Sequence, residues 1–110
     1  MATTYSVLGQ SNPSATTETT LLTASGTTGT VVSSVVICNQ ASTTATYRIA
    51  VRPSAQSSTT APNWIVYGAS VNGNDSTILT IGVTLSSGDK IQIYASSSTL
   101  SFSAFGSAIS

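Results

Sequence analysis

Hydrophobic and polar positions alternate with a period of two along most of this chain. In residues 47–52, Tyr47, Ile49 and Val51 alternate with smaller or charged residues. The pattern predicts strands that bury one face and expose the other. The same period recurs over residues 78–85, 90–95 and 99–103.

Residues 30–39 depart from this alternation in their second half. Val35–Cys38 is apolar at every position, which is typical of a strand in the middle of a sheet. A further strand is expected over residues 19–24. Thr, Ser, Val and Ile dominate the chain, and these residues favour strands over helices.

Turn signals separate these runs at intervals of about eight to twelve residues, the spacing of a β-sandwich or barrel. We expect a hairpin turn at Asn72–Asp75, because Asn-Gly accepts positive φ, and a second hairpin turn at Ser86–Asp89. Residues 39–44 are expected to form a hairpin loop, and Pro53–Pro62 a mobile surface loop. The remaining turn signals lie at residues 11–14 and 25–29.

Together these elements predict an all-β fold: a single β-sandwich of about eight short antiparallel strands, of jelly-roll or Greek-key type. We expect the sandwich to cover residues 15–110. Residues 1–14 contain a Pro, a Gly and polar residues without a strong core pattern, and are expected to form an extended N-terminal arm.

Charge is scarce in this sequence. The 110 residues include three basic and three acidic side chains and no histidine, whereas Ser and Thr account for 40 positions. Ordinary soluble domains carry about a quarter charged residues. A surface with so little charge has little protection against association, and it suits a protein packed against neighbours in a fixed assembly.

The charge balance and the hydropathy of the chain also indicate which partners and which location to expect. The net charge is zero, so no basic patch indicates nucleic acid. Val35–Cys38 is the longest aliphatic run, too short for a membrane-spanning helix, so we expect no membrane association. Met1–Tyr5 lacks the basic and apolar regions of a secretory signal, and we expect folding and assembly in a host cytoplasm.

The sequence lacks the combinations of residues that the common kinds of catalytic site require. The chain contains no histidine for a histidine-based nucleophilic site, and it has too few potential ligands for a zinc or calcium site. Asp75 and Asp89 lie in predicted turns, where carboxylates bond backbone N–H groups, and Glu18 is expected to be a solvated surface charge. We therefore expect no enzyme activity, no metal and no cofactor. Cys38 is expected to be a buried, inert thiol, with an intermolecular disulfide or a reactive thiol as the alternatives.

Two arginines are the most informative polar residues. Arg48 and Arg52 fall on the same outward face of one strand, about 13 Å apart. They can anchor a partner's carboxylates or carbonyls, or they can simply keep an exposed strand soluble. We take them as candidate interface residues.

The aromatic residues Trp64 and Tyr94 complete the set of candidate interface residues. Trp64 and Tyr67 are predicted on opposite faces of their strand, one in the core and one exposed. Packing in the core or at a subunit interface is favoured. Sugar binding is the alternative, but the sequence lacks the polar cluster that usually orients a sugar.

Six segments along the chain carry a likeness to a known group of proteins: Met1–Gln10, Val36–Asn39, Tyr47–Pro53, Asn74–Asp75, Leu85–Asp89 and Phe102–Gly106. They resemble short β-rich virion structural proteins of tailed bacteriophages, notably those of cyanobacteria and other aquatic bacteria. The resemblance covers essentially the whole chain and implies small β-rich components, often symmetric oligomers, mounted on the capsid or tail. No functional residue is carried over from it.

The leading hypothesis is a non-enzymatic virion protein, a capsid decoration or cement subunit that binds itself, as a homotrimer, and other virion proteins. The alternative is a tail, baseplate or fibre module. A third interpretation is a carbohydrate-binding module that docks the particle on host glycans.

Overall fold

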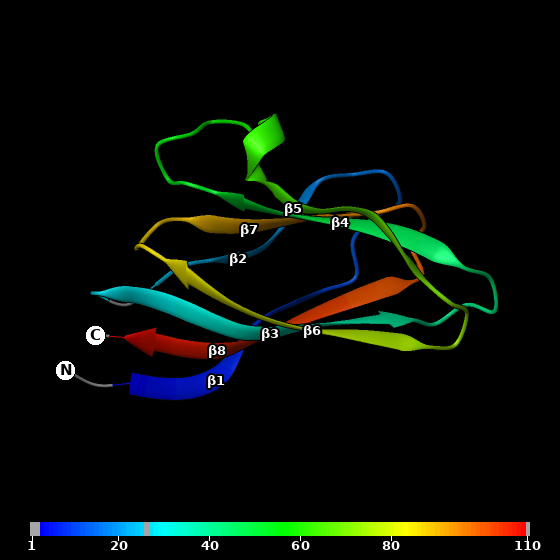
Figure 1. The fold of residues 1–110 in the computed structure, drawn as a ribbon, viewed down its shortest axis with the longest axis horizontal. Coiled ribbons are helices and arrows are strands. Elements are labelled where there is room, and N and C mark those ends of the chain that lie inside the picture. The colour runs from blue at the N-terminus through cyan, green and yellow to red at the C-terminus, as the bar shows by residue number, and fades with distance from the viewer. Residues whose placement is uncertain (1–2, 26, 110) are drawn as a thin grey trace.

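The computed structural model describes residues 3–25 and 27–109 as two antiparallel sheets of four strands each, packed face to face (Figure 1). No α-helix occurs in these residues, and one short 3-10 helix, η1 (Ala61–Asn63), precedes β5. Gly26, in the expected turn over residues 25–29, lies outside the described residues. The strands are β1 (Thr3–Ser11), β2 (Thr19–Thr23), β3 (Gly29–Asn39), β4 (Ala45–Arg52), β5 (Trp64–Val71), β6 (Ser76–Leu85), β7 (Lys90–Ala95) and β8 (Leu100–Ile109).

The connectivity is that of a jelly roll. Sheet A has the order β1-β8-β3-β6 and sheet B the order β2-β7-β4-β5. An eight-stranded double sheet of this kind contains two Greek keys. The predicted all-β sandwich is therefore confirmed, and β3 lies in the middle of sheet A as expected from its apolar run.

Most connections cross from one sheet to the other. Only β4 and β5 are consecutive strands paired within one sheet. The loops at residues 39–44, 72–75 and 86–89, which were expected to close hairpins, instead connect a strand of one sheet to a strand of the other. Turn residues indicate that the chain reverses direction. The same residue types occur in a turn that crosses between two sheets and in a turn that closes a hairpin.

Asn74, rather than the preceding Asn-Gly pair, adopts the left-handed conformation in the 72–75 turn, with φ 56°. Gly73 has a different role there. A Cβ at Gly73 would overlap the backbone of Ser42, so glycine permits the β3–β4 and β5–β6 loops to approach closely.

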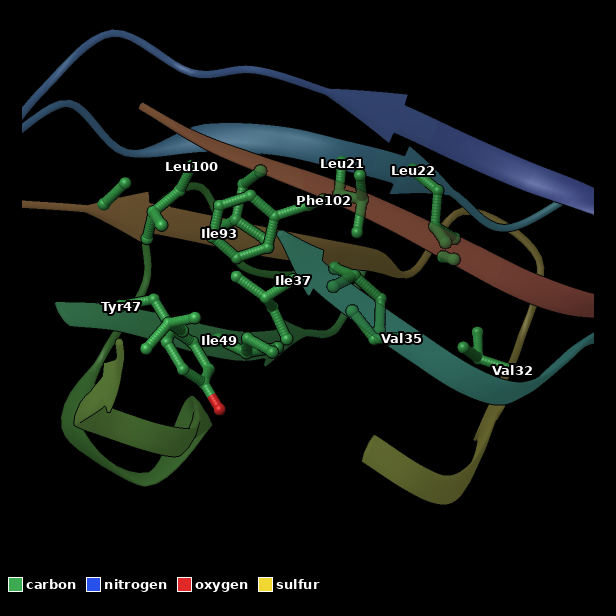
Figure 2. Close-up of a cluster of buried hydrophobic side chains, with 14 of the residues drawn as sticks. Leu21, Leu22, Val32, Val35, Ile37, Tyr47, Ile49, Ile93, Leu100 and Phe102 are labelled. Carbon is green, nitrogen blue, oxygen red and sulfur yellow. The ribbon is translucent and has the colours of Figure 1, made fainter. Parts of the chain in front are cut away.

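The core lies between the sheets and follows the alternation of the strands (Figure 2). Tyr47 of β4 and Phe102 of β8 meet across it, with ring centres 6.2 Å apart in an edge-to-face arrangement. Ile37, Ile49 and Ile93 are fully buried beside them. These inward positions are those that the period of two predicted.

The predicted N-terminal arm differs from the structure. Within residues 3–14, β1 is an edge strand of sheet A that pairs along its length with β8. Among residues 5–11 of β1, whose side-chain burial is described, Leu8 is the one hydrophobic residue that packs against the core, at a bulge between Val7 and Gly9. An edge strand that contributes so little to the core carries a weak alternation, which is why the sequence did not reveal it.

Candidate functional site

The outer face of sheet B carries a row of aromatic side chains around one arginine. Because β4 turns Tyr47 and Ile49 inward, it turns Arg48 outward, between β7 and β5. The Arg48 guanidinium carbon lies 4.3 Å from the Tyr94 ring centre and 4.1 Å from the Tyr67 ring centre. The Trp64 ring centre is 6.0 Å away. We call Tyr94, Arg48, Tyr67 and Trp64 the aromatic row.

One irregularity in β5 puts Trp64 and Tyr67 on the same face. The pairing with β4 shifts between Val66 and Trp64, which inserts an extra residue, Ile65, into the alternation. A second shift at Gly68, whose φ is +85°, turns Tyr67 outward relative to Ala69. Trp64 and Tyr67 are consequently edge to face, with ring centres 5.5 Å apart. The predicted placement on opposite faces is wrong for this reason.

A pocket opens beside the aromatic row. Its volume is about 530 Å³. Trp64 and Tyr67 form its aromatic side, while the loop before β5 contributes threonine hydroxyls. The lining residues are Thr59, Thr60, Ala61, Trp64 and Tyr67.

The hydroxyl-bearing side of this pocket is held by local hydrogen bonds. The Thr60 backbone N–H and hydroxyl both donate to Asn63 Oδ1, at 2.8 and 3.0 Å. The Thr59 hydroxyl donates to Glu18 Oε2 at 2.6 Å. The loop at Pro53–Pro62, expected to be mobile, is thus attached at its second half to η1 and to the start of β2.

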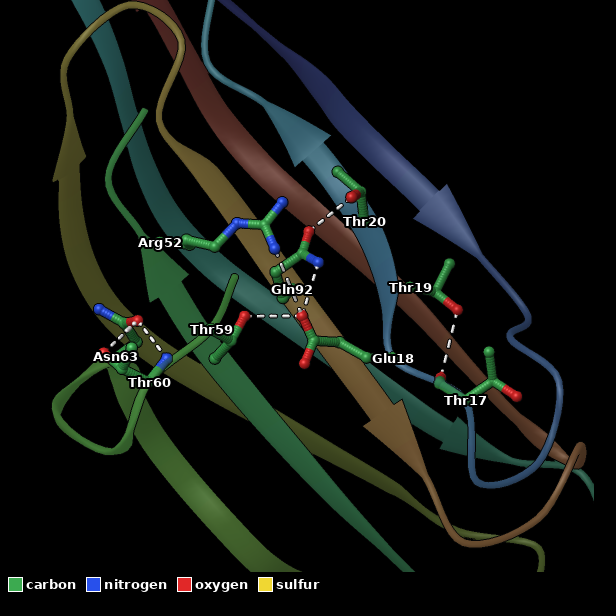
Figure 3. A network of polar contacts seen from close by, with 9 residues as sticks. All are labelled: Thr17, Glu18, Thr19, Thr20, Arg52, Thr59, Thr60, Asn63 and Gln92. Carbon is green, nitrogen blue, oxygen red and sulfur yellow. Dashed lines mark hydrogen bonds and ion pairs between the residues drawn. The ribbon is translucent and has the colours of Figure 1, made fainter. Parts of the chain in front are cut away.

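Glu18 is the centre of a polar network rather than an isolated surface charge (Figure 3). Besides Thr59, its Oε2 accepts from Gln92 Nε2 at 2.8 Å and lies 3.7 Å from Arg52 Nη1. Gln92 Oε1 in turn accepts from the Thr20 hydroxyl at 2.5 Å. Glu18 is exposed, as expected for a surface charge, but it is not isolated, because partners from β4, β7 and the 53–62 loop surround it.

Arg48 and Arg52 share the outer face of β4 as predicted, but their surroundings differ. The Arg52 side chain is only 15% exposed and is paired with Glu18, whereas no hydrogen bond or ion pair of Arg48 is found among the residues that the structure describes. Three of the four candidate residues, Arg48, Trp64 and Tyr94, come together. Sequence reasoning missed Tyr67 as their partner, although Gly68 within a strand is a signal of a bulge.

The other two carboxylates are engaged with backbone groups, as expected for turn residues. Asp89 accepts from the Ser54 N–H at 2.9 Å and from the Ser86 N–H at 3.0 Å. Asp75 accepts from the Ser76 N–H at 2.8 Å. Within residues 3–25 and 27–109, no group of three or more potential metal ligands is found, and no helix there is long and apolar enough to cross a membrane.

The outer face of sheet A forms a second, different surface. Tyr5 is 80% exposed and Ile78 is 68% exposed, and both point away from the core. Val7, also exposed, is the cross-strand partner of Phe105. Cys38 lies on this face as a half-buried free thiol, less buried than expected. Tyr5, Val7 and Phe105 line one shallow hollow on this face, whereas Ile78 lies apart from them at the opposite edge of sheet A. We call Tyr5, Val7 and Phe105 the apolar face.

Comparison of the chain with protein-family models, with curated proteins and with solved structures found no match.

Proposed function

We propose that this protein is a non-enzymatic structural subunit of a phage virion, a capsid decoration or cement protein that assembles as a symmetric oligomer. The proposal rests on the apolar face, which exposes large apolar side chains on a protein that has very few charges. Large apolar side chains exposed together mark surfaces that are covered in an assembly.

The geometry favours packing through the apolar face over strand addition at the edge. Tyr5 and Val7 project from β1, and Phe105 lies beside them on the neighbouring strand β8, where it is the cross-strand partner of Val7. The bulge at Leu8 interrupts the free edge of β1, and bulges discourage pairing with another chain's strand. A neighbouring subunit that covers this face would bury apolar surface without separating charges.

The jelly roll is compatible with this role, because the same architecture serves in viral capsid domains. It also serves in lectins, so the fold by itself does not establish the function. The virion assignment is supported by the resemblance of segments along the whole chain to phage structural proteins.

Cryo-electron microscopy of the purified particle tests the placement. Density for this chain at symmetry positions between major capsid subunits is expected. Density confined to the tail would overturn the capsid assignment in favour of the tail, baseplate or fibre alternative. Copy number measured by mass spectrometry separates the same two cases, since a decoration protein requires hundreds of copies and a tail module a few to a few dozen.

Self-assembly is tested separately by light scattering and native mass spectrometry. A homotrimer or another closed ring is expected. Tyr5→Ser combined with Val7→Ser should shift the oligomer toward monomer, whereas Thr80→Ala on β6, at the opposite edge of sheet A, should not. An oligomer that survives the double substitution unchanged would exclude the apolar face as its interface.

A further inference from the structure

The pocket beside the aromatic row has the size and lining of a small-ligand site. Ligand pockets commonly measure about 300–1,000 Å³ and combine apolar walls with a few polar groups. This one measures about 530 Å³ and combines two aromatic rings with two threonine hydroxyls. Assembly through the apolar face leaves it unused, because the two surfaces belong to different sheets.

The aromatic side of the pocket suits a flat ring that carries C–H groups. Tyr67 is 65% exposed, and Trp64 stands edge to face with it. The two rings therefore offer surfaces at a steep angle to each other, 76° between their planes. A pyranose presents C–H groups on one face and hydroxyls around its rim, so it can pack on one ring while its rim faces the threonines.

The threonine hydroxyls are polarised as acceptors. Thr59 and Thr60 already donate their hydroxyl protons to Glu18 and Asn63. Their remaining lone pairs can accept hydrogen bonds from ligand hydroxyl groups. A ligand rich in O–H donors is therefore favoured over one that offers only acceptors.

Arg48 brings a positive charge next to this pocket, because its guanidinium carbon lies 4.1 Å from the ring centre of Tyr67, one of the lining residues. Its guanidinium lies over the rings of Tyr67 and Tyr94, an arrangement that stabilises its position and leaves the in-plane N–H groups as donors. Glu18 is committed to Arg52, Gln92 and Thr59. The fork of a guanidinium matches a carboxylate.

We propose that this pocket binds an acidic saccharide, with the sugar ring on Trp64 and Tyr67 and its carboxylate on Arg48. The inference extends beyond the structural role and does not depend on where the protein lies in a particle. It names a uronic or sialic acid unit as the ligand class.

Titration of the full chain, followed by NMR or calorimetry, tests the proposal. The acidic probes are hexagalacturonate and sialyllactose, and the uncharged counterparts are maltohexaose and lactose. At least one acidic probe should bind more tightly than its uncharged counterpart. Absence of binding by both acidic probes at millimolar concentration would overturn the proposal, and so would equal affinity for acidic and uncharged saccharides.

Variants locate the site. Tyr67→Ala should weaken binding of the acidic probe about tenfold, because it removes one stacking surface. Arg48→Gln should remove the preference for the acidic probe, and Arg48→Lys should restore it only in part, because lysine lacks the fork. Tyr5→Ala, on the apolar face, is the matched control and should bind as the wild type does. Unchanged binding in both Tyr67→Ala and Arg48→Gln would place the ligand elsewhere.

The same variants separate this proposal from a role in assembly. If Tyr67→Ala changes the oligomer mass and no saccharide binds the wild type, the aromatic row is a subunit interface and the saccharide proposal fails. If saccharide binding is lost while the oligomer mass stays constant, the site acts independently of assembly.

Discussion

Arg48 and Tyr94 are direct cross-strand partners on β4 and β7, and the guanidinium carbon of the first lies 4.3 Å from the ring centre of the second. The contact fixes one side of the aromatic row. It also explains how Arg48 is held without an ion-pair partner among the described residues, since the flanking rings attract the cation.

A double-mutant cycle measures this contact. Arg48→Ala and Tyr94→Leu, made singly and together, should give a coupling energy of about 0.5–1 kcal/mol in urea unfolding. The same cycle with Arg48→Ala and Ile65→Ala, on β5 outside the row, should give a smaller coupling. Additive single effects for Arg48 and Tyr94 would show that the rings do not stabilise the arginine.

Asn39 should be the polar residue on which folding depends most. Its amide nitrogen donates to the carbonyls of Thr43 and Val71, and its Oδ1 accepts from the Ala41 N–H and the Thr99 hydroxyl. Asn39→Ala should lower the free energy of unfolding by about 3 kcal/mol, because several buried groups lose partners. Thermal or urea unfolding provides the measurement.

The neighbouring Gln40→Ala is the control for Asn39, because the Gln40 side chain is exposed. It should change the free energy of unfolding by less than about 0.5 kcal/mol. Equal losses for the two variants would contradict the importance assigned to the Asn39 hydrogen bonds.

Glu18→Gln should loosen the loop over residues 53–62. The substitution removes the charge that faces Arg52, whose side chain is 15% exposed, and weakens the bond from Thr59. We expect faster hydrogen exchange and faster proteolysis in the loop, with a loss of about 1–2 kcal/mol in the free energy of unfolding. Asp75→Asn, whose carboxylate contacts only the adjacent N–H, should leave exchange in this loop unchanged.

Stability should fall at high pH through Tyr47. Burial raises the pKa of the Tyr47 phenol above its ordinary value, because the phenolate would lose its hydration. Above the ordinary value of about 10, the unfolded chain releases this proton while the folded chain retains it. The free energy of unfolding therefore decreases as pH rises through that range.

Tyr47→Phe isolates this effect. The difference in the free energy of unfolding between the wild type and Tyr47→Phe should be constant below about pH 9 and should shift against the wild type as the pH rises further. Urea unfolding at a series of pH values measures it. Parallel curves across the whole range would show that Tyr47 does not contribute.

The aromatic row could be predicted from the sequence only in part. Arg48, Trp64 and Tyr94 could each be recognised as candidates from residue type and strand position. Their contact with one another could not be predicted, because it requires the order β7-β4-β5 within sheet B. The position of Tyr67 depends on bulges in β5, and the alternation of apolar and polar residues along the sequence does not reveal them.

The sequence by itself determined the all-β class, the inward faces of the central strands and the positions of the main turns. These are local properties, since side chains on a strand alternate with a period of two and turns require particular residues. The tertiary structure alone decided which turns cross between the sheets, whether residues 3–11 pair with β8, and which partners neutralise Glu18. Those outcomes depend on contacts between residues far apart in the chain, and no local pattern encodes them.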